Sequence, residues 1–317
     1  MGFKQVGKHK RQDIRLFRQG KISFVLNAEK TGQAADFSKE HGSGANAMGF
    51  VVEDAEFAHA EALKAGAKDA SDAAHSGLRA IYGIGGSLLY LVDDSSFYDA
   101  EFDFTSEDRN PDGFGLTYID HLTHNVYRGN MNVWAKFYED IFNFKEIRYF
   151  DIEGKLTGLK SRAMTSPCGK IRIPLNESSD DKSQIEEFLN RFNGEGIQHI
   201  ALGTNDIYAT VDALGAAGIP LQDTPDTYYE MLNERVPGHG EELAELKKRK
   251  ILLDGAPTED QGILLQIFTQ DAMGPVFFEI IQRKGNEGFG EGNFQALFES
   301  IELDQVRRGV LDDKAAG

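Results

Sequence analysis

Three side chains that lie far apart in this sequence have the chemistry of a metal site. Glu279 interrupts the apolar run GPVFFEII, a pattern typical of a buried strand. An unpaired carboxylate in such a strand is very unfavourable, so it must be neutralised, paired with a cation or bound to a metal. His121 in YIDHLTHNV and His199 in GIQHIAL lie in two further apolar strands. These three residues are therefore candidate metal ligands.

Two imidazoles and one carboxylate are the ligand set typical of non-haem Fe(II) oxygenases, which keep three coordination positions open. Open positions suit a substrate that chelates the metal through two oxygens while dioxygen takes the third. Zinc can bind the same donors, but the sequence has no HEXXH helix and no glutamate beside either histidine that could act as a general base. The alternative for Glu279 is a structural ion pair with a lysine or arginine.

An internal repeat indicates how these residues are positioned. Three stretches, starting at ANAMGFVV, GLTYIDHL and GIQHIALG, each show an apolar strand, an amphipathic helix and further strands. Asp54 and Asn205 are the expected N-caps of the first and third helices, which Gly66 and Gly218 are expected to end. The second helix has an apolar stripe at helical spacing, formed by Val133, Trp134, Phe137, Tyr138 and Ile141.

The two histidines occupy equivalent places in this repeat. His121 and His199 lie in the opening strands of the second and third copies, whereas the first copy has Ala47, Met48 and Gly49 there. The pattern predicts that the second and third copies share a metal and that the first copy is structural.

The other histidines and the cysteine are expected to play no part in this site. His124 follows His121 by three residues and should point to the opposite face of the strand. We expect the remaining histidines in solvated helices, loops or the charged N-terminal segment: His9, His41, His59, His75 and His239. Cys168 is the only cysteine, which excludes an intrachain disulfide and a thiolate cluster.

Composition narrows the functional classes. The 317 residues suffice for two domains, and the net charge of −17 argues against nucleic acid or an anionic membrane as partner. No apolar stretch approaches the ~18 residues of a membrane-spanning helix, and the first residues lack a signal-peptide core. We therefore predict a cytoplasmic protein. A polar stretch with proline and glycine, residues 105–115, is the expected domain boundary.

Several stretches resemble the bacterial 4-hydroxyphenylpyruvate dioxygenase family: IDHLTHNVYRG, GKIRIPLNE, SQIEEFL, GIQHIAL, GPVFFEIIQRKG and GFGEGNFQALFESIE. The resemblance implies an α+β vicinal oxygen chelate fold, with repeated βαβββ modules that form two open barrels and a C-terminal helix. It further implies a metal-free N-terminal domain, residues 1–112, and an iron-binding catalytic domain, residues 113–317.

The N-terminal domain departs from the family pattern, since its leading strand and helix are missing. The chain begins within its first module, where 13–17 and 22–26 are expected to form a hairpin. That would leave an exposed sheet edge unless another subunit covers it, so a homo-oligomer is expected.

By the same resemblance, His121, His199 and Glu279 bind iron. Polar and aromatic positions implied to contact the substrate are Ser161, Asn176, Gln184, Gln266, Phe268, Phe289 and Phe294. Gln198 is a weaker candidate, because a residue next to a ligand in a strand faces the other way. The last helix, with Phe294, Leu297, Phe298 and Ile301 at helical spacing, is expected to pack over the barrel mouth.

The implied reaction uses Fe(II) and dioxygen to convert 4-hydroxyphenylpyruvate to homogentisate and carbon dioxide, a step of tyrosine catabolism. The substrate carries its own 2-oxo acid, so no separate electron donor is needed. Hydroxymandelate synthase, which acts on the same substrate, is the nearest alternative. A non-catalytic binding protein of the same fold is another, and extradiol ring-cleaving enzymes share the ligand set.

Overall fold

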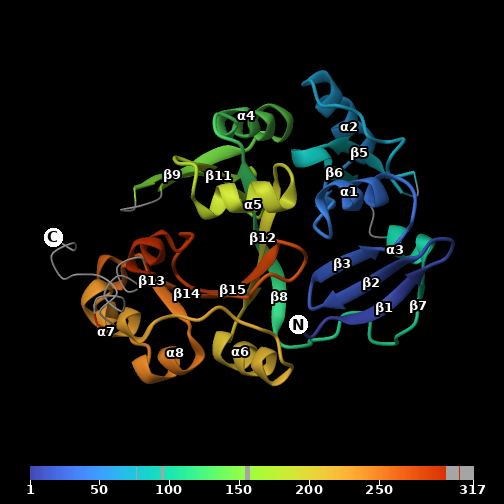
Figure 1. Ribbon diagram of the computed structural model, residues 1–317. Coiled ribbons are helices and arrows are strands. Elements are labelled where there is room, and N and C mark those ends of the chain that lie inside the picture. The colour runs from blue at the N-terminus through green and yellow to red at the C-terminus, as the bar shows by residue number, and fades with distance from the viewer. Residues whose placement is uncertain (76, 94–95, 154–157, 298–306, 308–317) are drawn as a thin grey trace.

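The computed structural model describes residues 1–75, 77–93, 96–153, 158–297 and 307. In this part of the chain the strands form a four-stranded, a three-stranded and an eight-stranded sheet, with helices packed around them (Figure 1). The protein is therefore an α+β protein, as predicted. No helix in the described ranges is long and apolar enough to cross a membrane.

The N-terminal half contains the two smaller sheets. The four-stranded sheet has the order β3-β2-β1-β7 and the three-stranded sheet the order β4-β6-β5. Their strands are β1 (Lys4–His9), β2 (Ile14–Gln19), β3 (Ile22–Asn27), β4 (Ala47–Val51), β5 (Arg79–Tyr82), β6 (Leu88–Val92) and β7 (Phe102–Phe104). The helices are α1 (Gln33–His41), α2 (Ala55–Lys64), η1 (Ile84–Gly86) and α3 (Phe97–Glu101).

The predicted hairpin is confirmed, since β2 and β3 pair antiparallel. The sequence prediction missed β1, which precedes the hairpin and pairs with both β2 and β7. β3 lies at the edge of its sheet, and its Val25 and Leu26 are 47% and 48% exposed.

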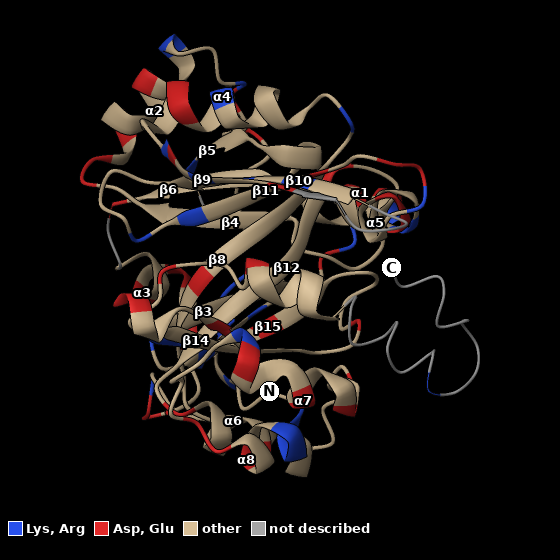
Figure 2. Ribbon diagram, turned by 90° about the vertical axis from the view of Figure 1, so that its left-hand side faces the viewer, with Lys and Arg blue, Asp and Glu red and all other residues tan. Residues whose placement is uncertain are grey.

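The C-terminal half is built on the eight-stranded sheet, whose order is β13-β14-β15-β12-β8-β11-β10-β9. Its strands are β8 (Leu116–Val126), β9 (Lys145–Glu153), β10 (Gly158–Thr165), β11 (Arg172–Ser178), β12 (Gly196–Thr204), β13 (Leu252–Gly255), β14 (Ile263–Phe268) and β15 (Phe277–Lys284). The helical elements are α4 (Met131–Phe142), α5 (Gln184–Phe192), α6 (Ile207–Ala216), α7 (Asp226–Arg235), α8 (Leu243–Arg249) and η2 (Pro257–Glu259). The sheet curls, so that its β9 end and its β13 end face each other (Figure 1), and α5 lies to one side of the curled sheet (Figure 2).

This sheet consists of two βαβββ modules, which confirms the repeat. One module is β8-α4-β9-β10-β11 and the other is β12-α6-β13-β14-β15, with α7 and α8 inserted after α6. In each module the first strand pairs in parallel with the last, β8 with β11 and β12 with β15. The modules join where β8 and β12 pair antiparallel. The link from β7 to β8 contains the predicted boundary at residues 112/113, and the domain division itself stays a prediction.

The predicted ends of α2 and α6 are confirmed, except for the N-cap of α6. Asp54 accepts a hydrogen bond from the Phe57 amide at 2.8 Å and caps α2. For α6 the cap is Asp206, which accepts from the Ala209 amide at 3.0 Å, so Asn205 was the wrong choice. The helix begins one residue later than expected, and Asp206 has the extended backbone that a cap requires.

Three histidines that we expected in a solvated helix, a loop or the charged N-terminal segment are buried, which corrects the expectation of a solvated His59. His9, His41 and His59 are each less than 8% exposed. Each imidazole packs with its apolar part while a nitrogen meets a polar partner. The His41 ring stacks on Phe192 with ring centroids 4.7 Å apart, and its Nδ1 lies 2.9 Å from the Phe192 carbonyl oxygen.

His124 lies on the face of β8 opposite His121, as predicted. It is fully buried, and its Nε2 lies 2.8 Å from the hydroxyl of Tyr138 in α4. Burial lowers the pKa of His124 to about 3, so it is neutral at physiological pH.

The chain re-enters a helix at residues 291–297. Ala296 is buried in the C-terminal core and Leu297 packs against it, whereas Phe294 is 39% exposed. Phe298 and Ile301, which we expected on the same apolar face, lie outside the described residues.

The contact of η1 with the start of β12 gives a stability prediction. Both Gly85 and Gly86 have positive φ, but a Cβ on Gly85 would lie 2.1 Å from the Glu195 carbonyl oxygen, and one on Gly86 would meet nothing within 4 Å. Gly86→Ala should therefore destabilise the protein by about 1–2 kcal/mol, because alanine is strained in the left-handed backbone conformation. Gly85→Ala should cost the same backbone strain and roughly 1–3 kcal/mol more, because its Cβ would overlap the Glu195 carbonyl oxygen. Urea unfolding of both variants measures the difference; equal losses would contradict the contact.

Candidate metal centre

The three predicted ligands come from consecutive strands of the eight-stranded sheet, in the order β15-β12-β8. In the register, Ala201 of β12 lies between His121 of β8 and Glu279 of β15. A bulge places Gln198 as an extra residue in β12, next to His199. The register therefore brings both histidines to the face of the sheet that Glu279 occupies.

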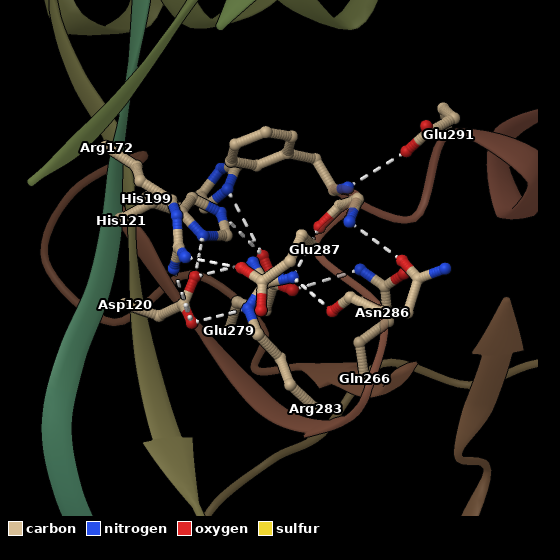
Figure 3. Close-up of polar contacts among 12 residues, drawn as sticks. Asp120, His121, Arg172, His199, Gln266, Glu279, Arg283, Asn286, Glu287 and Glu291 are labelled. Carbon is tan, nitrogen blue, oxygen red and sulfur yellow. Dashed lines mark hydrogen bonds and ion pairs between the residues drawn. The ribbon is translucent and has the colours of Figure 1, made fainter. Parts of the chain in front are cut away.

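The three side chains converge on one point (Figure 3). The Nε2 atoms of His121 and His199 lie 3.2 and 3.4 Å from Oε2 of Glu279. One ligand atom from each residue lies within 4.8 Å of the others. In the described part of the chain no lysine or arginine lies within ion-pair distance of Glu279, and the ionisable groups at that distance are the two imidazoles. Two nitrogens and one carboxylate oxygen at this spacing suit a divalent cation.

The pKa values of these side chains reflect this convergence. Burial opposes the charge on Glu279, but the neighbouring His121 and His199 outweigh it and lower the pKa of Glu279 to about 2. Burial also opposes charge on His121, yet Glu279 and Asp120 raise its pKa to about 9. Burial keeps the pKa of His199 below its ordinary value. Glu279 is therefore ionised and holds a proton on His121 in the place where a metal would bind.

Each histidine has an acceptor at its other nitrogen. Nδ1 of His121 lies 2.8 Å from Oδ1 of Asp120, and Nδ1 of His199 lies 3.0 Å from Oε1 of Gln198. Both Nδ1 atoms can therefore donate to these oxygens, and in a neutral imidazole this leaves the Nε2 lone pair for a metal. Gln198, the weaker candidate in the sequence, contacts a candidate ligand here.

Asp120 is held by two arginines that sequence reasoning missed (Figure 3). Arg283 donates to both Asp120 oxygens at 2.8 Å, and Arg172 lies 3.6 Å from Oδ2. Although burial opposes ionisation, Arg283 and His121 hold the pKa of Asp120 far below its usual range. Arg283 also donates to the carbonyl oxygens of Asn286 and Gly288 at 3.0 and 2.6 Å. The only signals in the sequence were the acid beside His121 and the arginine shortly after Glu279.

Aromatic rings surround the ligands. Phe289 lies 5.3 Å from the His121 ring and Phe268 lies 6.2 Å from the His199 ring, both edge to face. Phe277, which was not predicted, stacks on His199 at 5.0 Å. It alternates with Glu279 along β15, and that period was the signal that could have found it. Phe294 makes no ring contact with the ligands among the described residues.

The predicted polar residues fall into three places. Ser161 and Asn176 lie directly opposite each other on β10 and β11 and are both buried. Gln184 is exposed at the first position of α5. Gln266, 2% exposed, donates from Nε2 to Oε1 of Glu279 at 3.0 Å. The structure thus brings Gln266 to the ligands and places Gln184 in solvent.

Two βαβββ modules whose curled sheet gathers two histidines and a glutamate define a protein of the vicinal oxygen chelate class. A family model described as "Hydroxyphenylpyruvate dioxygenase, HPPD, N-terminal" matches residues 1–103. A second, described as "Glyoxalase/Bleomycin resistance protein/Dioxygenase superfamily", matches residues 118–235.

Curated relatives identify the family within this class. The 4-hydroxyphenylpyruvate dioxygenase of Pseudomonas aeruginosa is 59% identical, over 98% of this chain and 89% of its own length. That of Legionella pneumophila strain Corby is 60% identical, over 99% and 90%. A solved mutant of 4-hydroxymandelate synthase from Streptomyces coelicolor superposes with a TM-score of 0.82 at 25% identity, covering 96% of this chain and 92% of that one. The chain belongs to the 4-hydroxyphenylpyruvate dioxygenase family.

The two faces of β8 predict different outcomes for neighbouring histidines. His121→Ala and His199→Ala should abolish stoichiometric Fe(II) binding, because each removes a converging Nε2. His124→Ala should lower the melting temperature, because it empties a buried site beside Tyr138, but should retain the metal. Anaerobic metal analysis with circular dichroism tests all three variants. Metal loss in His124→Ala equal to that in His121→Ala would mean that the wrong histidine was chosen.

Metal loading should also release a proton. Because the pKa of His121 is raised to about 9 in the metal-free site, its imidazole is protonated at pH 7, whereas a ligand imidazole must be neutral. Binding should release about one proton per metal, and affinity should rise with pH until about 9 and then level off. Anaerobic titration calorimetry in two buffers of different ionisation enthalpy measures the proton count. A count of zero at pH 7 would contradict the assignment.

Proposed function

We propose that this protein is an Fe(II)-dependent 4-hydroxyphenylpyruvate dioxygenase that forms homogentisate and carbon dioxide. The observation that carries the proposal is the convergence of His121, His199 and Glu279 on one buried point. Relatives with that printed name and about 60% identity over nearly the whole chain support it.

The proposed metal is Fe(II), because two histidines and one carboxylate are the ligands that non-haem Fe(II) oxygenases use. Bound there, iron would supply the oxidative chemistry of dioxygen, and the substrate's 2-oxo acid would supply the electrons. The chain would hold the ligands through Asp120, Gln198 and Gln266, whose hydrogen bonds fix the directions in which the ligand atoms point.

The proposed substrate pocket lies on the ligand side of the sheet. Phe268 and Phe289 pack edge to face against the imidazole rings of His199 and His121. There they would hold the aromatic ring of the substrate and exclude water. Ser161 and Asn176, paired across β10 and β11, would orient its polar groups. Gln184, at the start of α5, and Phe294, in the helix at residues 291–297, would contact the substrate only from more exposed positions.

Two further proposals concern context. We propose that the protein acts in the cytoplasm as a homo-oligomer, with 4-hydroxyphenylpyruvate and dioxygen as its small-molecule partners. The exposed Val25 and Leu26 on the edge strand β3 support the oligomer, because an apolar strand edge is a ready site for pairing.

Hydroxymandelate synthase is the second candidate, because a mutant of that enzyme shares the fold with a TM-score of 0.82. Both enzymes would act on one substrate through the same ligands, so their products distinguish them. The dioxygenases at about 60% identity favour ring hydroxylation over oxidation of the side chain.

Product analysis tests the function. The Fe(II)-loaded protein, given 4-hydroxyphenylpyruvate and dioxygen, should release homogentisate and carbon dioxide in equal amounts, and His199→Ala should release neither. Chromatography and headspace analysis measure both products. Mainly 4-hydroxymandelate would favour the synthase, and no turnover despite bound iron would favour a binding protein.

A further inference from the structure

The two oxygens of Glu279 face different partners. Oε2 faces the Nε2 atoms of His121 and His199, at 3.2 and 3.4 Å. Oε1 accepts the hydrogen bond from Gln266 at 3.0 Å. Glu279 and Gln266 are 1% and 2% exposed, so no bulk water competes for either oxygen. The orientation of the Gln266 amide therefore decides which carboxylate oxygen is free for a metal.

That amide is held at its other end by the segment GFGEGN. Asn293 donates from Nδ2 to Oε1 of Gln266 at 2.7 Å and is 2% exposed. Gly290 lets the segment pass directly over Gln266: it has φ +74°, and a Cβ there would lie 1.7 Å from Oε1 of Gln266. The glycines of this motif thus permit the contact that fixes Gln266.

The direction of this chain of hydrogen bonds is set at the end farthest from Glu279, by Arg235. Oδ1 of Asn293 accepts from the Tyr228 hydroxyl at 2.6 Å and from Nη2 of Arg235 at 3.1 Å. A guanidinium has donors and no acceptor, so the oxygen of Asn293 must face Arg235 and its nitrogen must face Gln266. Gln266 then turns its oxygen to Asn293 and its nitrogen to Glu279.

Arg235 itself is anchored to the fold. Its Nη2 donates to the Leu253 carbonyl oxygen at 2.8 Å, and its Nη1 lies 3.4 Å from Oδ1 of Asp254. Both partners belong to β13, while Arg235 ends α7. If the Gln266 amide were reversed, its oxygen would face Oε1 of Glu279 and its nitrogen would face Nδ2 of Asn293. An acceptor facing an acceptor and a donor facing a donor are both strongly unfavourable for buried groups.

We propose that Asn293, Tyr228 and Arg235 are positioning residues that keep Gln266 on Oε1 of Glu279 and leave Oε2 alone for the metal. The proposal rests on the proposed Fe(II) site. A carboxylate can bind a metal through one or both oxygens. Binding through one leaves three of about six positions for a chelating 2-oxo acid and dioxygen; binding through both would take one of these positions.

Asn293→Asp tests the direction of the relay. The new side chain has the same shape but no donor, so Gln266 should reverse to donate to it and release Oε1 of Glu279. Anaerobic loading with Co(II) as a probe, without substrate, should show an affinity lower by about tenfold or more. The visible spectrum of the bound Co(II) should change as the second oxygen reaches the metal.

Asn286→Asp is the matched control. Asn286 lies in the same segment and is 6% exposed, but its amide contacts the Gln261 carbonyl oxygen at 3.0 Å and the Gly288 amide at 2.7 Å. It touches neither Gln266 nor Glu279 in the described structure. Its Co(II) spectrum should match that of the parent, with affinity within about threefold, well below a ligand-partner effect.

Gln266→Leu completes the test by removing the donor itself. It should reproduce the spectral change of Asn293→Asp, and the double variant should be no worse than either single variant. If Asn293→Asp does not fold, Gln266→Leu decides alone, and a parental spectrum overturns the proposal. Additive losses, or an Asn293→Asp protein with parental affinity and spectrum, also overturn it. Normal Co(II) behaviour without turnover of 4-hydroxyphenylpyruvate would overturn the proposed function and leave the relay standing.

Discussion

The buried carboxylate of Glu279 is the constraint on which the C-terminal half depends. The side chain lies within an apolar strand and is only 1% exposed. An ionised group in such a place needs positive charge or hydrogen-bond donors around it. The two imidazoles that meet it come from the next two strands on one side of β15, in the order β15-β12-β8. Parallel pairing of β12 with β15 and antiparallel pairing with β8 set the register that makes this possible. The order of the strands therefore determines which groups compensate the buried charge of Glu279.

Each ligand is held by one polar neighbour, and two arginines fix the polarity of these contacts. Arg283 holds Asp120 behind His121, and Arg235 holds Asn293 behind Gln266. A guanidinium offers only donors, so each chain of hydrogen bonds can run in one direction. The directions of the His121 and Glu279 ligand atoms therefore depend on contacts with α7, β13 and the segment after β15, whereas His199 is oriented by Gln198 of its own strand.

Among the described residues of the N-terminal half no second group of candidate metal ligands is found, but this half supports the strand that carries Glu279. Phe278 alternates with Glu279 and points to the opposite face of β15. There the ring of Phe24 from β3 lies 6.0 Å from the Phe278 ring. α1 adds a second contact between the halves, because His41 stacks on Phe192 of α5. Packing on the outer face of β15 leaves its inner face free for the metal site.

The sequence by itself determined the repeat, the ligands' residue types and much of the element pattern. Period-two and helical patterns are local, so they predicted β8, β12, α4 and the β2–β3 hairpin, and they separated His124 from His121. The odd carboxylate in an apolar strand indicated Glu279 because burial of charge is costly wherever the strand lies.

Tertiary structure decided everything that depends on partners distant in the chain. Asp120, Arg283 and Asn293 carry no periodic signal, and their roles follow from which strands and loops the sheet brings together. The burial of His41, and the exposure of Gln184, were likewise unpredictable, since each depends on a packing surface from another module. A side chain's type is local information, whereas the direction of its hydrogen bonds is set by the groups that the fold places around it.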